Sequence, residues 1–316
     1  MIGRTALRIP SGLTPSEHRR AAAMLQERGI DTLVAAVRGA AFGPTWDAGS
    51  DYDLDFLQYY PALRCLRLDL RVTSLSGIEV LADSLEEFTL AQPPGFPYRI
   101  KVDPVLALKN LKAFRSAWKG LKYQRLAELT GLESIGIPGG QERVDLAAAL
   151  PKLRHFDLSF GSATSLRGIE RLEHLETFSG LRVTRLADIS PLTQNLGLRD
   201  IKFGSLRQVT GLPDLSAQPN LSIVRCLTMN GLIDLRGLRG SQVRELAFVG
   251  GRIPPEQFAG LADVLPRLER IMISLDRPHD TVAARHHIPP QLLVEGVSDL
   301  THYYRESDRW EFVAFP

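Results

Sequence analysis

The sequence predicts an α/β solenoid, in which the chain winds into successive coils of one short strand and one return segment each. Two observations predict this fold class. A pattern of apolar-x-x-apolar-x-apolar residues recurs ten times between residues 63 and 273. Apolar residues at three-residue spacing fill the stretches between its copies. One strand and one tight return path per repeat follow from these two spacings.

The strand pattern sets the phase of the repeats. Its best-formed copies include Leu63-Leu66-Leu68 and Leu153-Phe156-Leu158, where two-residue alternation at the end of the pattern predicts a strand. The first positions of the ten copies are Leu63, Leu85, Leu111, Leu132, Leu153, Leu175, Leu198, Leu221, Val243 and Leu268. They cover 205 residues in nine steps, so the period averages just under 23 residues.

The return segments repeat at a different spacing. Series such as Leu75-Ile78-Leu81 and Leu166-Ile169-Leu172 place one inward side chain on each turn of a 3₁₀-like or extended coil. No single repeat can bury its apolar face alone, so the repeats must stack and pair their strands in one parallel sheet. Because the return segments are bulkier than the strands, we expect the sheet on the concave side and a mostly 3₁₀ or extended convex side.

Two repeats depart from this scheme. Pro254-Pro255-Glu256-Gln257-Phe258, followed by Leu261 and Leu265, predicts a true helix on the convex side. The repeat that begins at Leu85 carries an insertion with prolines between residues 93 and 97, which predicts an irregular loop at one edge.

Over residues 51–275 this arrangement resembles the leucine-rich-repeat family, in particular the short class of about 22 residues found in internalins and in a phosphatase-1 regulatory subunit. The resemblance implies a right-handed superhelix capped at both ends. One feature differs from the family. Its ninth repeat position is usually Asn, and here residues such as Arg71, Gly140 and Met229 occupy it. We expect a looser turn after each strand.

Both flanks are predicted to cap the solenoid, because stacked repeats expose apolar core at their ends. Residues 1–50 contain a capping box at Thr14 and Glu17, a helix that stops at Gly29, and a strand from Ile30 to Val37. Residues 276–316 contain two apolar stretches, 292–294 and 310–315, that are expected to close the last coil. The predicted organisation is therefore a cap at 1–50, the solenoid at 51–275 and a cap at 276–316.

Composition narrows the classes of partner. Thirty-eight Lys and Arg stand against 36 Asp and Glu, and a net charge of +2 predicts no dominant attraction to nucleic acid or membranes. The start of the sequence has no signal-like apolar run, and no segment approaches a membrane span, which predicts a cytoplasmic protein. Cys65 and Cys226, 161 residues apart, are expected to be reduced thiols.

The sequence offers little for catalysis. It lacks the GxxxxGK[ST], GxGxxG, GxSxG and HExxH motifs, and its carboxylates form no convergent pair that spacing reveals. Four of seven histidines, His279, His286, His287 and His302, lie in the C-terminal tail, at spacings that match no familiar metal site. We predict no catalytic residue, no cofactor and no metal.

The predicted function is a protein-interaction scaffold that holds a partner protein on the concave sheet, because outward strand positions there combine Arg with sparse aromatics. The residues expected to contact the partner are Arg67, Arg115, Trp118, His155, Asp157, Phe160, Lys202 and Arg225. By analogy with the family, the partner could be a toxin or nuclease that the chain inhibits, as an immunity protein does. Two alternatives stay open at this point: a structural module that binds a small ligand or metal, and an enzyme that uses the histidines of the tail.

Overall fold

The computed structural model describes residues 5–36, 52–91, 99–116, 121–294 and 311–314. The chain forms two compact units, which are considered separately: a first unit of residues 1–132 with 297–316, and a second unit of residues 133–296. The insertion at residues 93–97 lies outside the described residues.

The described residues of the first unit form six strands that pair in parallel in the order β13-β1-β2-β3-β4-β5. Its strands are β1 (Thr5–Pro10), β2 (Thr32–Ala36), β3 (Cys65–Asp69), β4 (Glu87–Leu90), β5 (Ala113–Ser116) and β13 (Glu311–Ala314). Its helices are α1 (Pro15–Arg28) and the 3₁₀ turns η1 (Asp55–Tyr59), η2 (Ile78–Leu81), η3 (Asp103–Ala107) and η4 (Tyr123–Glu128). One strand and one 3₁₀ turn per repeat confirm the predicted coil.

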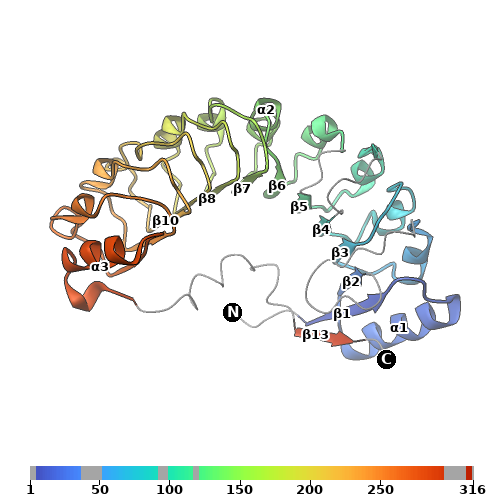
Figure 1. Ribbon diagram of the computed structural model, residues 1–316. Helices are drawn as coiled ribbons and strands as arrows, with labels where there is room; N and C mark the ends of the chain where they lie inside the picture. Colours follow the sequence, from blue (N-terminus) through green and yellow to red (C-terminus); the bar gives the residue numbers. More distant parts are fainter. Residues whose placement is uncertain (1–4, 37–51, 92–98, 117–120, 295–310, 315–316) are drawn as a thin grey trace. The chain divides into compact units, whose positions relative to one another are not determined.

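The second unit holds seven strands, paired in parallel from β6 to β12 in chain order. They are β6 (Ser134–Pro138), β7 (His155–Ser159), β8 (Thr177–Leu181), β9 (Asp200–Gly204), β10 (Ile223–Leu227), β11 (Glu245–Val249) and β12 (Arg270–Ser274). Its helices are α2 (Gln141–Ala148), η5 (Ile169–Arg171), η6 (Ser190–Gln194), η7 (Arg236–Leu238), η8 (Pro255–Phe258), α3 (Pro278–His286) and η9 (Pro290–Leu292). Within this unit the strands lie along the inner side of the curve and the turns along the outer side (Figure 1). The chain thus forms the predicted α/β solenoid with an open parallel sheet.

The core of each unit is a stack of equivalent side chains from successive coils. At the fourth repeat position, Phe88 packs on Phe114 in the first unit with ring centroids 5.7 Å apart. In the second unit Phe178 packs on Phe156 at the same position, at 5.8 Å, and on Phe203 at the sixth position of the next coil, beside Gly180, at 6.3 Å. All five rings are at most 1% exposed. Edge-to-face contacts of this kind add to the burial of apolar area, so each coil is held by its neighbours.

The turn after five successive strands of the second unit, β7 to β11, is regular, which differs from the expectation of a looser turn. Phe160, Arg182, Ser205 and Thr228 all have φ between 52° and 54°, and Gly250 follows at 67°. These residues occupy the eighth repeat position of five successive coils. The N–H of each donates to the seventh-position carbonyl of the next coil, at 2.6–2.9 Å. A left-handed residue therefore takes the place of the Asn side chain, and the backbone itself closes the turn.

The predicted helix at Pro254 is wrong, and a helix that the sequence pattern did not reveal lies elsewhere. Residues Pro255–Phe258 form only a single 3₁₀ turn, because Gly260 adopts a left-handed φ of 68° shortly afterwards. The true convex helix is α2, whose sequence QERVDLAA has high helix propensity and no Pro or Gly. It buries Val144, Leu146 and Ala147.

Two buried amides join coils on the convex side of the second unit. Asn195 Nδ2 donates to the carbonyls of Ile169 and Leu172, at 2.9 and 3.0 Å. Gln218 Nε2 donates to the carbonyls of Leu192 and Thr193, at 3.3 and 2.7 Å. Each amide thus reaches back one coil and adds a side-chain hydrogen bond between coils, in three of the four cases to a carbonyl that also accepts from a backbone N–H of its own turn.

The N-terminal flank agrees with its prediction. Thr14 caps α1 in a capping box with Glu17, and Gly29 ends the helix at φ 62°. Strand β2 then follows within the predicted range, up to Ala36. The cap boundary at residue 50 stays a prediction.

The C-terminal flank differs from its prediction in one respect. Leu293 bridges Ile271 of β12, so this part of the flank does lie against the last coil, next to α3. Strand β13, however, pairs in parallel with β1 in the first unit, from Thr5↔Glu311 to Arg8↔Ala314. The expectation that residues 310–315 close the last coil is therefore wrong for residues 311–314. The edge of β1 is unpaired in the repeat pattern, and an apolar extended segment can pair with such an edge.

Among the residues that the structure describes, no helix combines the length and apolar character needed to cross a membrane.

Candidate functional site

The outward face of the sheet in the second unit is a grid of side chains set by strand register. Side chains alternate along a strand, so the third, fifth and seventh repeat positions point away from the core. At the fifth position, Asp157, Ser179, Lys202 and Arg225 are neighbours on β7 to β10. At the third position, His155, Thr177 and Asp200 are neighbours on β7 to β9. The predicted residues His155, Asp157, Lys202 and Arg225 thus lie on β7, β9 and β10, three of four adjacent strands.

An ion pair lies at the centre of this grid. Arg225 Nη1 donates to both carboxylate oxygens of Asp200, at 2.8 and 3.0 Å. The two side chains are only 12% and 11% exposed. Charges removed from water in this way require a partner, so the pair fixes the position of Arg225. Asp200 therefore holds the Arg225 side chain in place on the outward face of the sheet.

A second polar contact lies beside the ion pair. His155 Nδ1 and Thr177 Oγ1 are 2.8 Å apart and form a hydrogen bond across β7 and β8. Lys202, on β9, is 3% exposed, and Ser179, on β8, is 9% exposed. The centre of the face is consequently polar, closely packed and largely shielded from solvent.

The rim of the face is different, because there a large aromatic ring is exposed. Phe160 is 41% exposed and has the left-handed backbone conformation described above. The guanidinium of Arg182, at the same position of the next coil, lies 5.6 Å from the centroid of its ring. A stacked Arg–Phe pair offers apolar area and hydrogen-bond donors at low entropic cost, as interface hot spots do.

The remaining predicted contacts belong to the first unit. Arg67, on β3, forms an ion pair with Asp69 on the same strand, with Nε 2.9 Å from Oδ1. Arg115 lies on β5 and is half-buried. Trp118 lies outside the described residues. The predicted partner contacts are therefore divided between the two units, and those of each unit are described as a separate group.

Prediction from the sequence overlooked one charged column. At the second repeat position the charge alternates in sign from coil to coil: Arg64, Glu86, Lys112, Glu133, Arg154, Glu176 and Arg199. Arg64 and Lys112 both contact Glu86, at 2.7 and 3.0 Å, and Arg154 pairs with Glu176. The alternation in the sequence is the signal that could have revealed this column, which borders the outward face where each strand begins.

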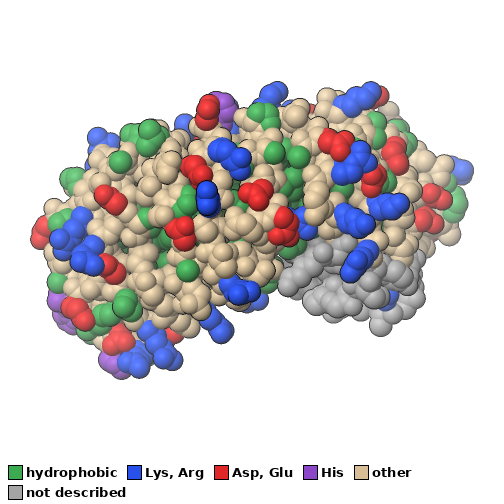
Figure 2. Space-filling model, turned by 90° about the horizontal axis from the view of Figure 1, so that it is seen from above, with side chains coloured by type: hydrophobic (Ala, Val, Ile, Leu, Met, Phe, Trp, Pro, Cys, Tyr) green, Lys and Arg blue, Asp and Glu red, His purple; other side chains and the backbone are tan. Residues whose placement is uncertain are grey.

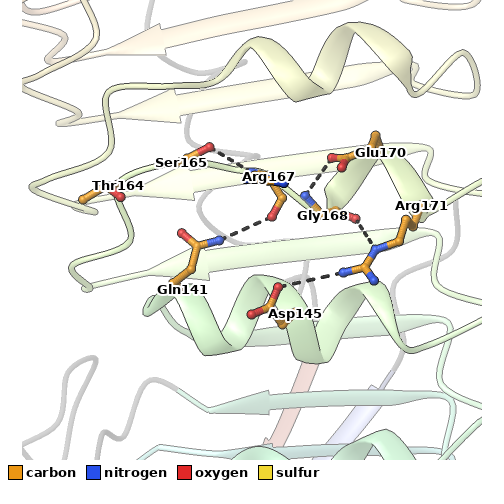
Figure 3. A pocket seen from close by; sticks show the side chains of 8 residues that line it. All are labelled: Gln141, Asp145, Thr164, Ser165, Arg167, Gly168, Glu170 and Arg171. Atoms are coloured by element: carbon orange, nitrogen blue, oxygen red, sulfur yellow. Dashed lines mark hydrogen bonds and ion pairs between the residues drawn. The ribbon is translucent and has the colours of Figure 1, made fainter.

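A hollow of about 630 Å³ lies on the convex side of the second unit. It lies between α2 and the turn before η5, and its polar lining residues mostly contact one another (Figure 3). Gln141 donates to the carbonyl of Arg167 at 3.3 Å, the N–H of Gly168 donates to Glu170 at 2.7 Å, and Arg171 lies 3.9 Å from Asp145. Because these groups satisfy one another, the hollow has the character of an ordinary surface groove.

The titratable groups do not converge on a reactive centre in the part of the chain that the structure describes. No group of three or more His, Cys, Asp or Glu residues there is arranged to hold a metal ion. His279 pairs with Asp280 at 3.1 Å on the exposed surface of α3, and His286 bonds the carbonyl of Val282 in the same helix. Burial raises the pKa of the Cys226 thiol to about 12, which opposes formation of a thiolate.

Charged side chains of both signs are mixed on the described part of the surface that bears the turns. Figure 2 shows the face that bears the turns, where Lys and Arg side chains alternate with Asp and Glu. Such a surface gives no reason to expect a polyanionic partner on this side.

Comparison with known proteins identifies the fold. No protein-family model matches the chain, and no curated protein sequence matches it. Among solved structures, an internalin of Listeria monocytogenes is similar over 81% of this chain and 70% of its own, with 16% identity and a TM-score of 0.53. Internalin C2 of the same organism covers 55% of this chain and 75% of its own, with 19% identity and a TM-score of 0.45. The chain has the leucine-rich-repeat fold.

Proposed function

We propose that this leucine-rich-repeat chain is a non-enzymatic scaffold that binds a partner protein on the outward face of its sheet. The observation that carries the proposal is the structure of that face in the second unit. A closely packed polar centre, with Arg225 held by Asp200, adjoins a rim where Phe160 and Arg182 stack and Phe160 is exposed.

The contrast between centre and rim matches the composition of protein interfaces. Partner proteins gain most of their binding free energy from a few aromatic and arginine side chains, surrounded by contacts that mainly exclude water. Phe160 and Arg182 supply the first kind of contact. His155, Asp157, Lys202 and Arg225 belong to the polar centre that this pair adjoins, and Arg67, Arg115 and Trp118 are proposed as contacts in the first unit.

The chemistry of the described residues favours binding over catalysis. The Cys226 thiol is buried, and His279 and His286 are exposed on α3. A general base must lie within hydrogen-bond reach of its substrate in a site that excludes water, and α3 offers no such enclosure.

The proposal can be made more specific about the compartment, the class of partner and the effect of binding. The balanced charge and the absence of a membrane-spanning helix in the described ranges support a cytoplasmic protein whose partner is neither nucleic acid nor membrane. A curved sheet that covers a large area suits a chain that blocks the active site of another protein. We therefore propose inhibition of a partner enzyme, as by a bacterial immunity protein, as the specific role.

An affinity capture with matched variants tests the proposal. The tagged chain is incubated with extract of the cells that naturally make it, and bound proteins are identified by mass spectrometry. Phe160→Asn removes the exposed ring and keeps a residue that tolerates the left-handed backbone. We expect the partner captured by the wild-type chain to be lost with Phe160→Asn.

Val282→Asn is the matched control, since Val282 is 56% exposed on α3 in the same unit and lies outside the outward face. It should retain the partner. If the two variants capture equal amounts of partner, or if the wild-type chain captures none, the proposed function is wrong.

A further inference from the structure

The alternating charge column at the second repeat position is interrupted once in the second unit. After Arg199 the next coil carries Ser222, and the series then resumes with Arg244 and Glu269, which pair at 2.7 Å. An acidic residue is expected at position 222 from the alternation. Ser222 instead leaves two arginines of like charge on either side of a neutral, short side chain.

Backbone hydrogen bonds place these three residues side by side. The N–H of Ser222 donates to the carbonyl of Arg199 at 2.9 Å, and the N–H of Arg244 donates to the carbonyl of Ser222 at 2.8 Å. The strands that follow, β9, β10 and β11, are neighbours in one parallel sheet (Figure 1). Arg199 and Arg244 therefore lie two strand spacings apart, about 9.6 Å, with Ser222 between them.

The nearby carboxylates are engaged elsewhere. Glu176 pairs with Arg154, Asp200 with Arg225, and Glu245 with Arg270. Arg199 forms no ion pair with any residue that the structure describes, and its side chain is exposed. Arg244 pairs with Glu269, so Arg199 is the cation beside the gap whose charge no described residue neutralises through an ion pair.

The first unit shows what an occupied position looks like. Glu86 lies between Arg64 and Lys112, one coil away on each side, and contacts both. Hydrogen bonds from Lys112 and Arg64 hold the pKa of the Glu86 carboxyl below its usual value. A carboxylate between two cations is therefore an arrangement that this solenoid already contains, and the coil of Ser222 has the two cations without the carboxylate.

We infer that the gap at Ser222 receives a single Asp or Glu side chain of the partner protein, between Arg199 and Arg244. This inference rests on the proposed function, because the gap borders the proposed binding face. The surroundings of the gap also define the residues that flank this acid in the partner. Glu176 and Glu269 lie on the outer sides of the two arginines, two coils from Ser222 in each direction.

These flanking carboxylates disfavour a polyanion, and each is also paired with an arginine of this chain, Glu176 with Arg154 and Glu269 with Arg244. A nucleic acid strand that follows the column would bring phosphates next to Glu176 and Glu269, and like charges repel. The complementary segment is instead one acid with a basic residue on each side. Two coils measure about 9.6 Å and three residues of extended chain about 10 Å, so the expected spacing is basic-x-x-acidic-x-x-basic.

The first test fills the gap from within the chain. Ser222→Glu should restore the alternation and raise the melting temperature by about 1–3 °C at low ionic strength, the gain expected from a surface ion pair in a unit of this size. The gain should disappear in the Arg199→Ala background and persist in the Arg239→Ala background. Arg239 is an exposed arginine of the same unit with no ion pair to a described residue. A gain independent of Arg199 would overturn the inference.

The second test measures binding of a synthetic probe to the full chain. The probe is a fluorescent heptapeptide with Lys at both ends, Glu at the centre and Thr elsewhere, and its control has Gln at the centre. Fluorescence anisotropy in about 0.01 M salt should show binding of the Glu peptide, weakened about fivefold by Ser222→Glu or Arg199→Ala and unchanged by Arg239→Ala. Equal binding of the two peptides, no binding of either, or tighter binding of a single-stranded oligonucleotide would overturn it.

The partner from the affinity capture separates the two proposals. If Ser222→Glu leaves capture unchanged while Phe160→Asn abolishes it, the acid-binding gap is wrong and the scaffold function stands. If Phe160→Asn leaves capture unchanged, the proposed face is wrong whatever the peptide does.

Discussion

The two units bury polar groups in opposite ways. In the first unit, His18 of α1 is 8% exposed and stacks between Phe56 and Tyr59, each 5.4 Å away, with Nδ1 2.8 Å from Tyr60 Oη. In the second unit, Asp200 and Arg225 form a charged pair on the outward face of the sheet. One unit keeps its buried polar pair neutral within aromatic rings, and the other keeps charges that neutralise each other.

This difference predicts that the stability of the first unit depends on pH through its buried pair, and that the stability of the second unit depends on both members of its charged pair being present. Burial lowers the pKa of His18, with a smaller opposing effect from Glu17, and burial raises the pKa of the Tyr60 hydroxyl. Both effects favour the uncharged forms. The Asp200–Arg225 pair instead depends on both partners being present, because either charge alone would be poorly solvated.

The largest expected effect comes from breaking the charged pair. Asp200→Ala removes the carboxylate and leaves Arg225 with little access to water, so the free energy of unfolding should fall by about 3 kcal/mol. Urea unfolding followed by circular dichroism measures this loss. The double variant Asp200→Leu/Arg225→Leu should lose much less, and a double variant at least as unstable as the single one would contradict the explanation.

Removal of one partner should cost less stability in the neutral pair of His18 and Tyr60. Tyr60→Phe keeps the ring that packs edge-on to His18 and removes only the hydroxyl, so Nδ1 loses its hydrogen-bond partner. We expect a loss of about 1–2 kcal/mol in the free energy of unfolding, the usual cost of one unsatisfied buried polar atom. Tyr59→Phe is the control, since Tyr59 stacks on His18 through its ring face and should lose little.

The pH dependence of the first unit should come from His18. Its folded pKa lies below the unfolded value of 6.5, so the unfolded state binds the proton more readily. Stability should therefore be complete above about pH 6.5 and fall as the pH decreases towards the folded pKa. The free energy of unfolding lost on protonation should be smaller than the loss in Tyr60→Phe, because the protonated Nδ1 of His18 can still donate a hydrogen bond to Tyr60.

Thermal unfolding between pH 7.5 and pH 5 tests the histidine. His18→Phe should flatten the decline in melting temperature over this range, while His174→Gln, at an exposed position of the second unit, should leave it unchanged. An unaltered decline in His18→Phe would show that another group causes the acid sensitivity.

Much of the fold could be predicted from the sequence, because the leucine spacing is a local consequence of coil geometry. The register of the strands and the stacking of Phe156 on Phe178 follow from the same ten copies of the pattern. The α2 helix was missed because it replaces the three-residue spacing with QERVDLAA, which belongs to no repeat motif. The pairing of β13 with β1 joins residues about 300 positions apart, and no local pattern encodes such a contact.

The strand positions of the candidate site could be predicted from the sequence, but the contacts and backbone conformations of its residues could not. Outward strand positions follow from alternation, and the strand register places His155, Asp157, Lys202 and Arg225 on β7, β9 and β10, within four neighbouring strands. Sequence alone did not show that Arg225 bonds Asp200, because that contact spans 25 residues and depends on both side chains being shielded. The left-handed turn at Phe160 also escaped prediction, since residues other than Gly seldom adopt it.

The smallest expected effect concerns Arg67, which resembles Arg225 in sequence position and differs from it in burial. Arg67 pairs with Asp69 on the same strand, and their side chains are 25% and 24% exposed, about twice the values for Arg225 and Asp200. Solvent that reaches both groups weakens their attraction and also solvates whichever one remains. Asp69→Ala should therefore cost about 0.5 kcal/mol in urea unfolding, against about 3 kcal/mol for Asp200→Ala. Equal losses in the two variants would mean that burial does not distinguish the two pairs, and that the charged centre of the second unit is no more firmly held than the arginines of the first.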